Sequence, residues 1–198
     1  MDAIVEAALR KWPNVPHCHG WLALDARGEW YMRDERIQAA GPFPQVKGSR
    51  VDHVKLRAFI ERNYACDEAG AWFFQNGPQR VYVQLEAAPY VWRVADAPGW
   101  PVHSHTGLPA TVLSSWLDES GRLFLDTDIG YGLVHTMDMA VAAEAVQAGD
   151  VASAGMAGVG SGVLTGVLTG DLNGAWQPQE LLFTDMPVRF GYRLVAHH

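Results

Sequence analysis

The chain has 198 residues, of which 48% are hydrophobic and 19% charged, a balance typical of a folded globular protein and unlike a disordered one. Its formal net charge is −7 and its basic residues are scattered, which argues against nucleic acid as the main partner because phosphate binding needs clustered cations. The two cysteines, Cys18 and Cys66, imply no disulfide framework, and no apolar stretch reaches the roughly 20 residues of a membrane span. We therefore expect a cytoplasmic protein with no membrane partner.

The N-terminal half predicts a helix, a hairpin and a second helix. Residues 1–13 form an amphipathic pattern that a proline ends. A strand over 21–24 then enters a tight turn. Residues 49–65 carry apolar side chains at helical spacing, with Ser49 or Asp52 near the start, and predict the second helix.

The C-terminal half repeats this order. A strand over 114–117 leads into another tight turn. Residues 137–148 predict a helix with Thr136 as its N-cap and Gly149 at its end. A segment rich in Gly, Ala, Val and Thr follows over 150–174, and its role stays open.

Four places in the chain share an Asp-x-x-Gly turn with an aromatic or large apolar residue after it. In such a turn the Asp side chain accepts a hydrogen bond from the backbone two residues on, and the Gly supplies a positive φ. The turns begin at Asp25, Asp67, Asp118 and Asp171. A four-bladed propeller is excluded because the two helices occupy the sequence that two all-strand blades would need.

The surroundings of two of these turns also recur about 100 residues apart, as Gly-Ala-Trp followed by Pro-Gln, at 70–79 and at 174–179. This pattern predicts an internal duplication, although Asp/Gly turns beside aromatic residues also recur by chance in strand-rich proteins. We predict an α+β fold of two similar hairpin-helix-strand halves with mainly antiparallel sheets. The expected division is an N-terminal α+β unit over 1–97, a Pro/Gly-rich linker or crossing loop over 98–109, and a β-rich unit with one helix over 110–198.

Two His-x-His pairs are candidates for a metal site. Alternate residues of an extended segment point the same way, so each pair can chelate one divalent ion, and His53 or His135 could complete the site. The pairs are His17 with His19 and His103 with His105. Neither pair belongs to a longer metal motif, so histidines that form surface hydrogen bonds remain the alternative.

A candidate ligand site precedes the second predicted helix. Lys47 and Arg50 flank Ser49 there, and backbone N–H groups at a helix start would favour an anion. Trp100, in the predicted linker near His103 and His105, is a candidate for lining a pocket or a partner surface.

With these segments identified, the N-terminal half resembles a proteobacterial family catalogued only as a domain of unknown function. The resemblance is carried by the residues at 20–25, 32–34, 47–49, 62–64 and 72–81. It implies the same fold class and a bacterial cytoplasm, and it transfers no activity, cofactor or catalytic residue.

The step from Glu86 to Pro89 and the hairpin-helix-hairpin order also look like a related uncharacterised family, which has a small α+β domain followed by a β-roll. This resemblance implies a β-roll-like C-terminal half.

The leading functional hypothesis is a binding or accessory module for a small molecule or a protein. It assigns no cofactor, and it leaves a divalent metal and a homodimer open. It rests on the missing catalytic motifs and on the aromatic residues that the strands present. The alternative is a metal-dependent hydrolase or related enzyme that uses His103 and His105, with His17, His19 or His135 as further ligands.

Overall fold

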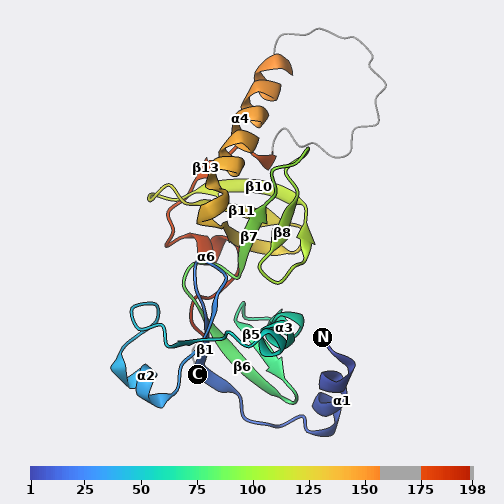
Figure 1. Cartoon of the computed structure of the whole chain (residues 1–198), viewed down its shortest axis with the longest axis vertical. Helices are drawn as coiled ribbons and strands as arrows, with labels where there is room; N and C mark the ends of the chain where they lie inside the picture. The colour runs from blue at the N-terminus through green and yellow to red at the C-terminus, as the bar shows by residue number, and fades with distance from the viewer. Residues whose placement is uncertain (157–174, 197–198) are drawn as a thin grey trace. The chain divides into compact units, whose positions relative to one another are not determined.

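The computed structural model describes residues 1–156 and 175–196. The chain divides into two compact units (Figure 1): the first combines Met1–Pro89 with the C-terminal segment from Met186, and the second is Tyr90–Asp185. Mixed helices and strands in two mostly antiparallel sheets confirm the predicted α+β class.

The first unit is built on a six-stranded sheet in the order β3-β2-β1-β6-β5-β4. Its central pair, β1 with β6, is parallel, and every other neighbouring pair is antiparallel. The strands are β1 (Cys18–Leu24), β2 (Trp30–Met32), β3 (Ser49–Arg50), β4 (Tyr64–Cys66), β5 (Trp72–Asn76) and β6 (Gln79–Leu85). The helices are α1 (Ala3–Lys11), α2 (Glu35–Ala40), α3 (Val54–Arg62) and the short α6 (Met186–Arg189).

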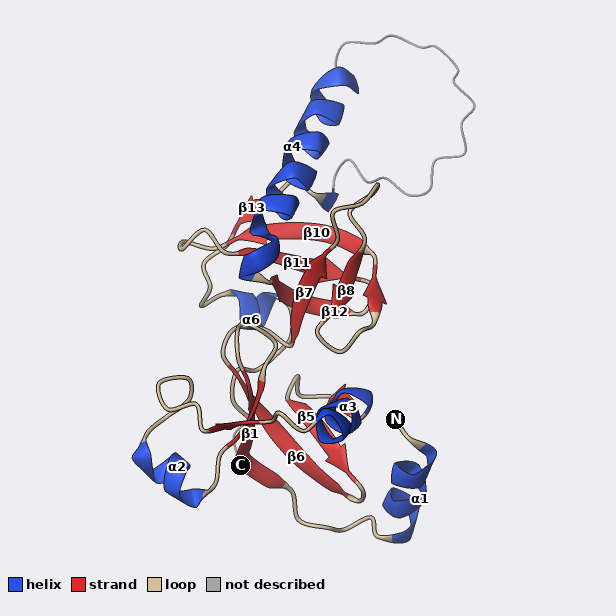
Figure 2. Cartoon of the chain, in the orientation of Figure 1, coloured by secondary structure: helices blue, strands red, loops and turns tan. Residues whose placement is uncertain are grey.

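The second unit holds a seven-stranded sheet in the order β13-β10-β11-β12-β7-β8-β9, which curls into a half-barrel (Figure 2). The pairs β12–β7 and β10–β13 are parallel and the others antiparallel. The strands are β7 (Tyr90–Val94), β8 (Val102–Ser104), β9 (Pro109–Ala110), β10 (Val112–Leu117), β11 (Leu123–Thr127), β12 (Gly130–Val134) and β13 (Gln179–Glu180). A 3-10 turn, η1 (Thr136–Asp138), leads into α4 (Met139–Met156).

Both predicted hairpins are present, as β1–β2 and β10–β11. Asp25 Oδ1 accepts hydrogen bonds from the backbone N–H groups two and four residues on, at 2.9 and 3.0 Å. Asp67 and Asp118 do the same in their turns. The glycine of each turn has the expected positive φ, between 74° and 80°. The fourth predicted turn, at Asp171, lies outside the described residues.

The predicted helix boundaries were partly wrong. Ser49 belongs to β3, and α3 begins only at Val54 because the His53 imidazole Nδ1 accepts the N–H of Leu56 at 3.2 Å and caps it. The second predicted helix begins with η1, whose N-cap is His135 rather than Thr136. Gly149 does not end α4, since one glycine lowers helix stability by only about 1 kcal/mol and does not block a helix.

Strand pairing divides the chain differently from the expected ranges of 1–97, 98–109 and 110–198. Strand β7 pairs with β12, so residues 90–97 lie with the second unit. The Pro/Gly-rich segment 98–109 contains β8 and enters β9, because its prolines lie at strand ends and at the sheet edge, where no ladder N–H is needed.

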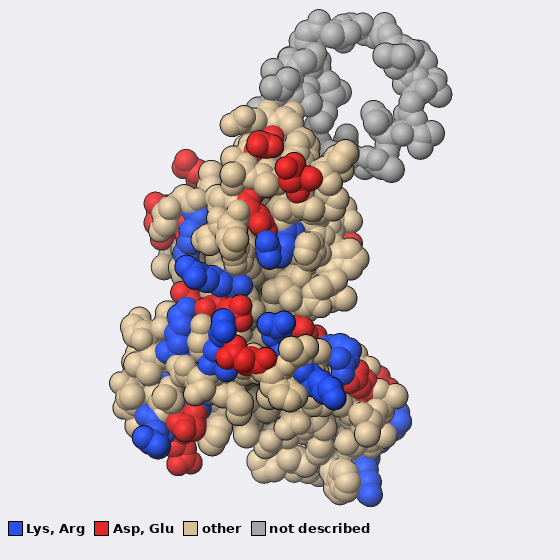
Figure 3. Space-filling model, viewed as in Figure 1, with Lys and Arg blue, Asp and Glu red and all other residues tan. Residues whose placement is uncertain are grey.

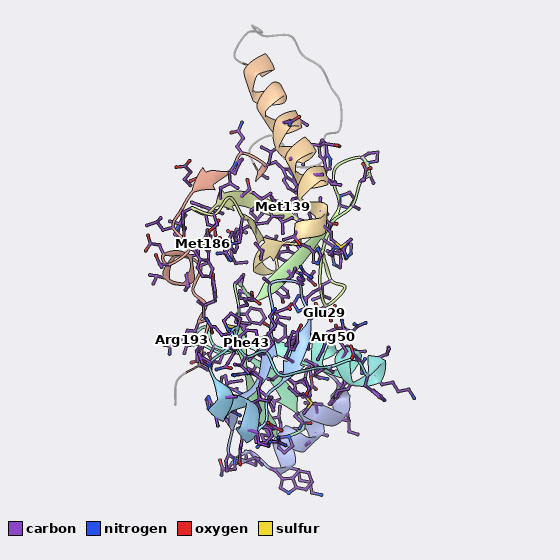
Figure 4. All side chains as sticks on the ribbon, turned by 60° about the vertical axis from the view of Figure 1, so that its left-hand side comes forward. Glu29, Phe43, Arg50, Met139, Met186 and Arg193 are labelled. Atoms are coloured by element: carbon purple, nitrogen blue, oxygen red, sulfur yellow. The ribbon has the colours of Figure 1, made fainter. Side chains whose placement is uncertain are left out.

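The last described residues return to the first unit. Leu194 accepts a hydrogen bond from the backbone N–H of Leu85 at 2.8 Å, and the Arg193 N–H donates to Gly70 at 2.9 Å. Figure 4 labels Met186, where this segment begins, and Arg193, near its last described residue. Among the described residues, none of the helices combines the length and the hydrophobicity needed to cross a bilayer.

Candidate functional site

The first histidine pair packs against a tyrosine. His19 stacks on Tyr82 with ring centroids 4.5 Å apart, and His17 meets the same ring edge-on at 5.9 Å. Tyr82 is fixed in turn by its hydroxyl, which donates to Asp67 Oδ2 at 3.0 Å. These histidines therefore belong to an aromatic cluster in the first unit.

The second pair is split between two environments in the second unit. His103 is exposed on β8, whereas His105 is half-buried and its Nδ1 accepts the N–H of Val91 at 3.2 Å. Burial lowers the pKa of His105 to about 3, so the ring is neutral at physiological pH. The pair does not present two imidazoles to one ion.

The two remaining candidates are capping residues, His53 for α3 and His135 for η1. Across residues 1–156 and 175–196, no three His, Cys, Asp or Glu side chains are grouped so that they could hold a metal ion. The alternative function as a metal-dependent hydrolase gains no support from this placement.

The predicted anion site does not have the geometry that motivated it. Residues 49–50 form an edge strand, and the helix starts four residues later than Arg50. Lys47 Nζ instead binds two carboxylates, Asp25 Oδ2 at 2.9 Å and Glu86 Oε2 at 3.2 Å. Arg50, labelled in Figure 4, pairs with Asp52 at 2.7 Å. Both cations are therefore already matched by acids.

The Lys47 cluster is tightly bonded. Burial alone would raise the pKa of Asp25, but hydrogen bonds from Lys47 and from the backbone of Glu29 and Arg27 lower it. Burial alone would lower the pKa of Lys47, but its bonds to Asp25 and Glu86 raise it. Both shifts favour the charged forms of Asp25 and Lys47, and we interpret the cluster as a brace between β1, β6 and the loop before β3.

Trp100 lies in the turn that joins β7 and β8 and has a positive φ of 45°. Its backbone N–H donates to the carbonyl oxygen of Ala97 at 2.9 Å. It is half-buried and shares the second unit with His103 and His105.

The feature that the sequence did not reveal is an irregularity in β1. Cys18 pairs with Val81 and Leu22 with Val83, so four steps along β1 match only two along β6. Extra residues of this kind form a bulge, which turns side chains out of the regular alternation and often lies beside a site. The bulge comprises His19, Gly20 and Trp21.

On one face of the sheet the bulge borders an apolar pocket of about 230 Å³, which α3 also lines. Its walls come from β1, β5, β6 and α3, and Phe59 of α3 contacts Phe74 of β5 edge-to-face at 5.4 Å. The wall side chains are Leu22, Phe59, Ile60, Phe74 and Val81.

The rim of this pocket is apolar and exposed. Trp21 is 40% exposed, Met32 48% and Leu56 37%. Two residues with polar atoms, Cys18 and Asn76, complete the lining. The helical stripe of Leu56, Phe59 and Ile60 was visible in the sequence, but the bulge that leaves it partly uncovered was not.

Charged side chains of both signs are mixed on the surface. On the face drawn in Figure 3, positive and negative groups lie next to one another rather than in separate fields.

Residues 1–195 match the protein family described as "Protein of unknown function (DUF2946)". The chain belongs to this family. The match confirms the predicted membership of an uncharacterised family, extends it from the N-terminal half to almost the whole chain, and assigns this DUF2946 protein no function.

Two solved structures are similar to the chain at low identity. A DUF1285 family protein from Silicibacter pomeroyi DSS-3 is 12% identical, with 70% of this chain and 81% of that chain covered and a TM-score of 0.43. A DUF1285 family protein from Shewanella baltica OS155 is 16% identical, with coverage of 60% and 86% and a TM-score of 0.41. No curated protein matches the sequence.

Proposed function

We propose that the first unit of this DUF2946 protein is a binding module for a small apolar molecule, held between α3 and the sheet. The observation that carries the proposal is the pocket of about 230 Å³ with carbon-lined walls and an exposed apolar rim. Apolar pockets with a few polar groups are the usual form of a ligand site.

The size of the pocket limits the ligand. An engineered protein cavity of about 150 Å³ holds benzene, whereas sites for drug-sized molecules begin at about 300 Å³. A pocket of about 230 Å³ therefore fits a molecule of one or two rings, or a short branched chain.

The lining provides both affinity and orientation. Covering about 100 Å² of apolar surface contributes on the order of 2.5 kcal/mol, and Trp21, Met32 and Leu56 offer surface of this kind. Asn76 ends β5 at the margin of the pocket, so its side-chain amide can bind one polar group of the ligand. The expected ligand is apolar with a single polar end.

The two cysteines allow a test within one protein. Cys18 lines the pocket and is half-buried, whereas Cys66 is exposed on the edge strand β4, outside it. Maleimide labelling, read by peptide mass spectrometry, should slow at Cys18 when indole, naphthalene or toluene is present and stay unchanged at Cys66. The substitution Ile60→Trp should fill the pocket and remove this protection. Equal labelling of Cys18 with and without all three probes would contradict the proposal.

A second copy of the chain is the competing occupant of the same apolar rim. Light scattering separates the two: a dimer that dissociates on substitution of Leu56 by Asp would assign the rim to self-association. A monomer that shows ligand-dependent protection of Cys18 would support the proposed binding module.

We place this module in a bacterial cytoplasm. Both cysteines are free thiols, which a reducing compartment maintains. Fractionation of a bacterium that expresses the tagged chain from its own locus should recover it with cytoplasmic markers, and recovery with periplasmic markers would contradict this location.

A further inference from the structure

The β1 bulge borders a second pocket, of about 240 Å³, whose lining mixes polar and apolar groups. Along β6, Val81 contributes to the apolar pocket, whereas Tyr82 and Gln84 contribute to this one. Because successive residues of a strand, such as Val81 and Tyr82, point to opposite faces, the two pockets lie on opposite sides of the sheet. The second pocket is bounded by His19, Gly20, Gln38, Tyr82, Val83, Gln84, Val195 and Ala196.

Gly20 allows a glutamine to approach the strand closely. Its φ is +78°, and a Cβ at this position would lie 2.5 Å from Gln38 Oε1. The Gln38 amide is held there because its Nε2 donates to the backbone oxygen of Arg33 at 2.9 Å. The sequence thus keeps a side-chain amide against the bulge.

The second glutamine is held by a buried cation. Arg33 is only 2% exposed and donates to Gln84 Oε1, to the Gly41 carbonyl at 2.6 Å and to the Val46 carbonyl at 3.2 Å. Since the Gln84 oxygen accepts from Arg33, its Nε2 donors are the atoms left for the pocket. The guanidinium polarises this amide and increases its strength as a donor.

The hydrogen-bond partners of Arg33 are neutral oxygens, and its guanidinium also lies over the Phe43 ring, 5.8 Å from the centroid. Within the described ranges, no carboxylate lies within 4.0 Å of its guanidinium, and the pocket lining contains no Asp or Glu. Burial lowers the pKa of Arg33, but an arginine stays protonated at physiological pH. A buried positive charge without a counter-ion favours a negative ligand in the adjacent space.

We infer that this pocket binds a small anion, a carboxylate or a phosphate, through the Gln84 amide with Arg33 behind it. The Gln84 N–H groups donate to the anion, and the positive charge one hydrogen bond away selects it over a neutral molecule of the same shape. This site is independent of the apolar pocket, and its ligand class differs.

The test compares isosteric probes on the intact chain by amide NMR. Acetate, acetamide and ethylamine are titrated at constant ionic strength in a low-chloride buffer, and inorganic phosphate is titrated separately. Saturable shifts at Gly20 and at the Gln84 side chain with acetate or phosphate, at least tenfold weaker with acetamide and ethylamine, would support the inference. If acetate binds more tightly than phosphate, the natural ligand is a carboxylate; if phosphate binds more tightly, it is a phosphate.

The variant Gln84→Glu places a carboxylate on Arg33 within the chain. It should bind the anion at least tenfold more weakly than the wild type and should melt at a higher temperature near pH 7. Gln79→Glu is the matched control, because Gln79 lies on the same strand outside the pocket and donates to Pro16 at 2.8 Å. It should leave anion binding unchanged.

Three results would overturn the inference: acetamide binding as tightly as acetate, no saturable shift with either anion, or undiminished binding by Gln84→Glu. The probe comparison needs only the wild-type chain, so it decides the matter even if the variant does not fold.

Discussion

Cys18 and His19 are neighbours in the sequence, yet they line cavities on opposite faces of the same sheet. The bulge in β1 borders both cavities, since Trp21 lines the apolar pocket and His19 and Gly20 line the other. The regular part of β1, from Leu22 to Leu24, continues unbroken in parallel pairing with β6. Two pockets therefore border one local irregularity.

The substitution Gly132→Ala should destabilise the second unit by about 1–3 kcal/mol. Trp92 crosses β12 at this glycine and donates from Nε1 to the Leu125 carbonyl at 3.2 Å. A Cβ on Gly132 would lie 2.5 Å from Trp92 Nε1 and 2.6 Å from the Tyr90 carbonyl oxygen. Chemical denaturation followed by tryptophan fluorescence measures the change.

Gly121→Ala is the control for that substitution, since its Cβ would meet nothing within 4 Å and only its positive φ of 74° is unfavourable. It should cost about 1 kcal/mol or less. A loss for Gly132→Ala no larger than for this control would show that Trp92 can shift without cost.

Acid should destabilise the second unit through His105. The pKa of this buried ring falls from 6.5 to about 3 on folding, so below pH 6.5 the unfolded chain binds a proton that the folded chain does not. Stability should therefore decrease as pH falls from 6.5 to about 3, with a loss of about 2 kcal/mol at pH 5. Urea unfolding at pH 7.5 and pH 5 measures it.

The variant His105→Gln removes the titrating group and should show a smaller loss between these two pH values, whatever its absolute stability. His103→Gln changes an exposed histidine of the same strand region and should keep the wild-type pH dependence. Parallel behaviour of the two variants would rule out His105 as the source.

Lys47→Met should destabilise the first unit by about 1–2 kcal/mol near pH 7, a value discounted because 37% of the Lys47 side chain is exposed. The loss arises because Asp25, with a side chain only 1% exposed, keeps its charge without its cation. The pKa of Asp25 is lowered on folding, so the ionised carboxylate contributes stability above the unfolded value of 3.8 and loses it as pH falls through the folded pKa. Thermal unfolding should show the two proteins converging below pH 3.8.

Arg50→Met removes the cation of an exposed pair, in which the side chains are 53% and 70% exposed, and should change stability by less than about 1 kcal/mol. If both variants lose the same stability, the burial of Asp25 does not increase the contribution of its ion pair with Lys47 to folding stability.

The parts of the fold that could be predicted are those set by neighbours in the chain. Asp25, Asp67 and Asp118 form their turns because each carboxylate reaches backbone N–H groups two and four residues away. The apolar spacing over α3 likewise predicted a helix from neighbours in the chain. Its start was not predictable, because Ser and Asp are preferred N-cap residue types, whereas the observed N-cap is His53.

The parts that could not be predicted depend on distant partners. No local signal indicates that β7 pairs in parallel with β12, about 40 residues later. The bulge is likewise a mismatch between β1 and β6, so it exists only in their pairing. The candidate residues chosen from local spacing stack on an aromatic ring, cap a helix or form ion pairs, whereas both pockets border that long-range mismatch.

The return of residues 186–196 to the first unit has a consequence for synthesis. Strands β1 to β6 are translated first, but the N–H of Leu85 and the carbonyl of Gly70 gain their partners only from Leu194 and Arg193. During translation, the first unit therefore stays incomplete until residues 186–196 have been synthesised, whereas Tyr90–Asp185 can complete its own sheet earlier. A nascent chain stopped before residue 186 would contain every strand of the second unit, but its first unit would lack the hydrogen bonds that residues 193 and 194 supply.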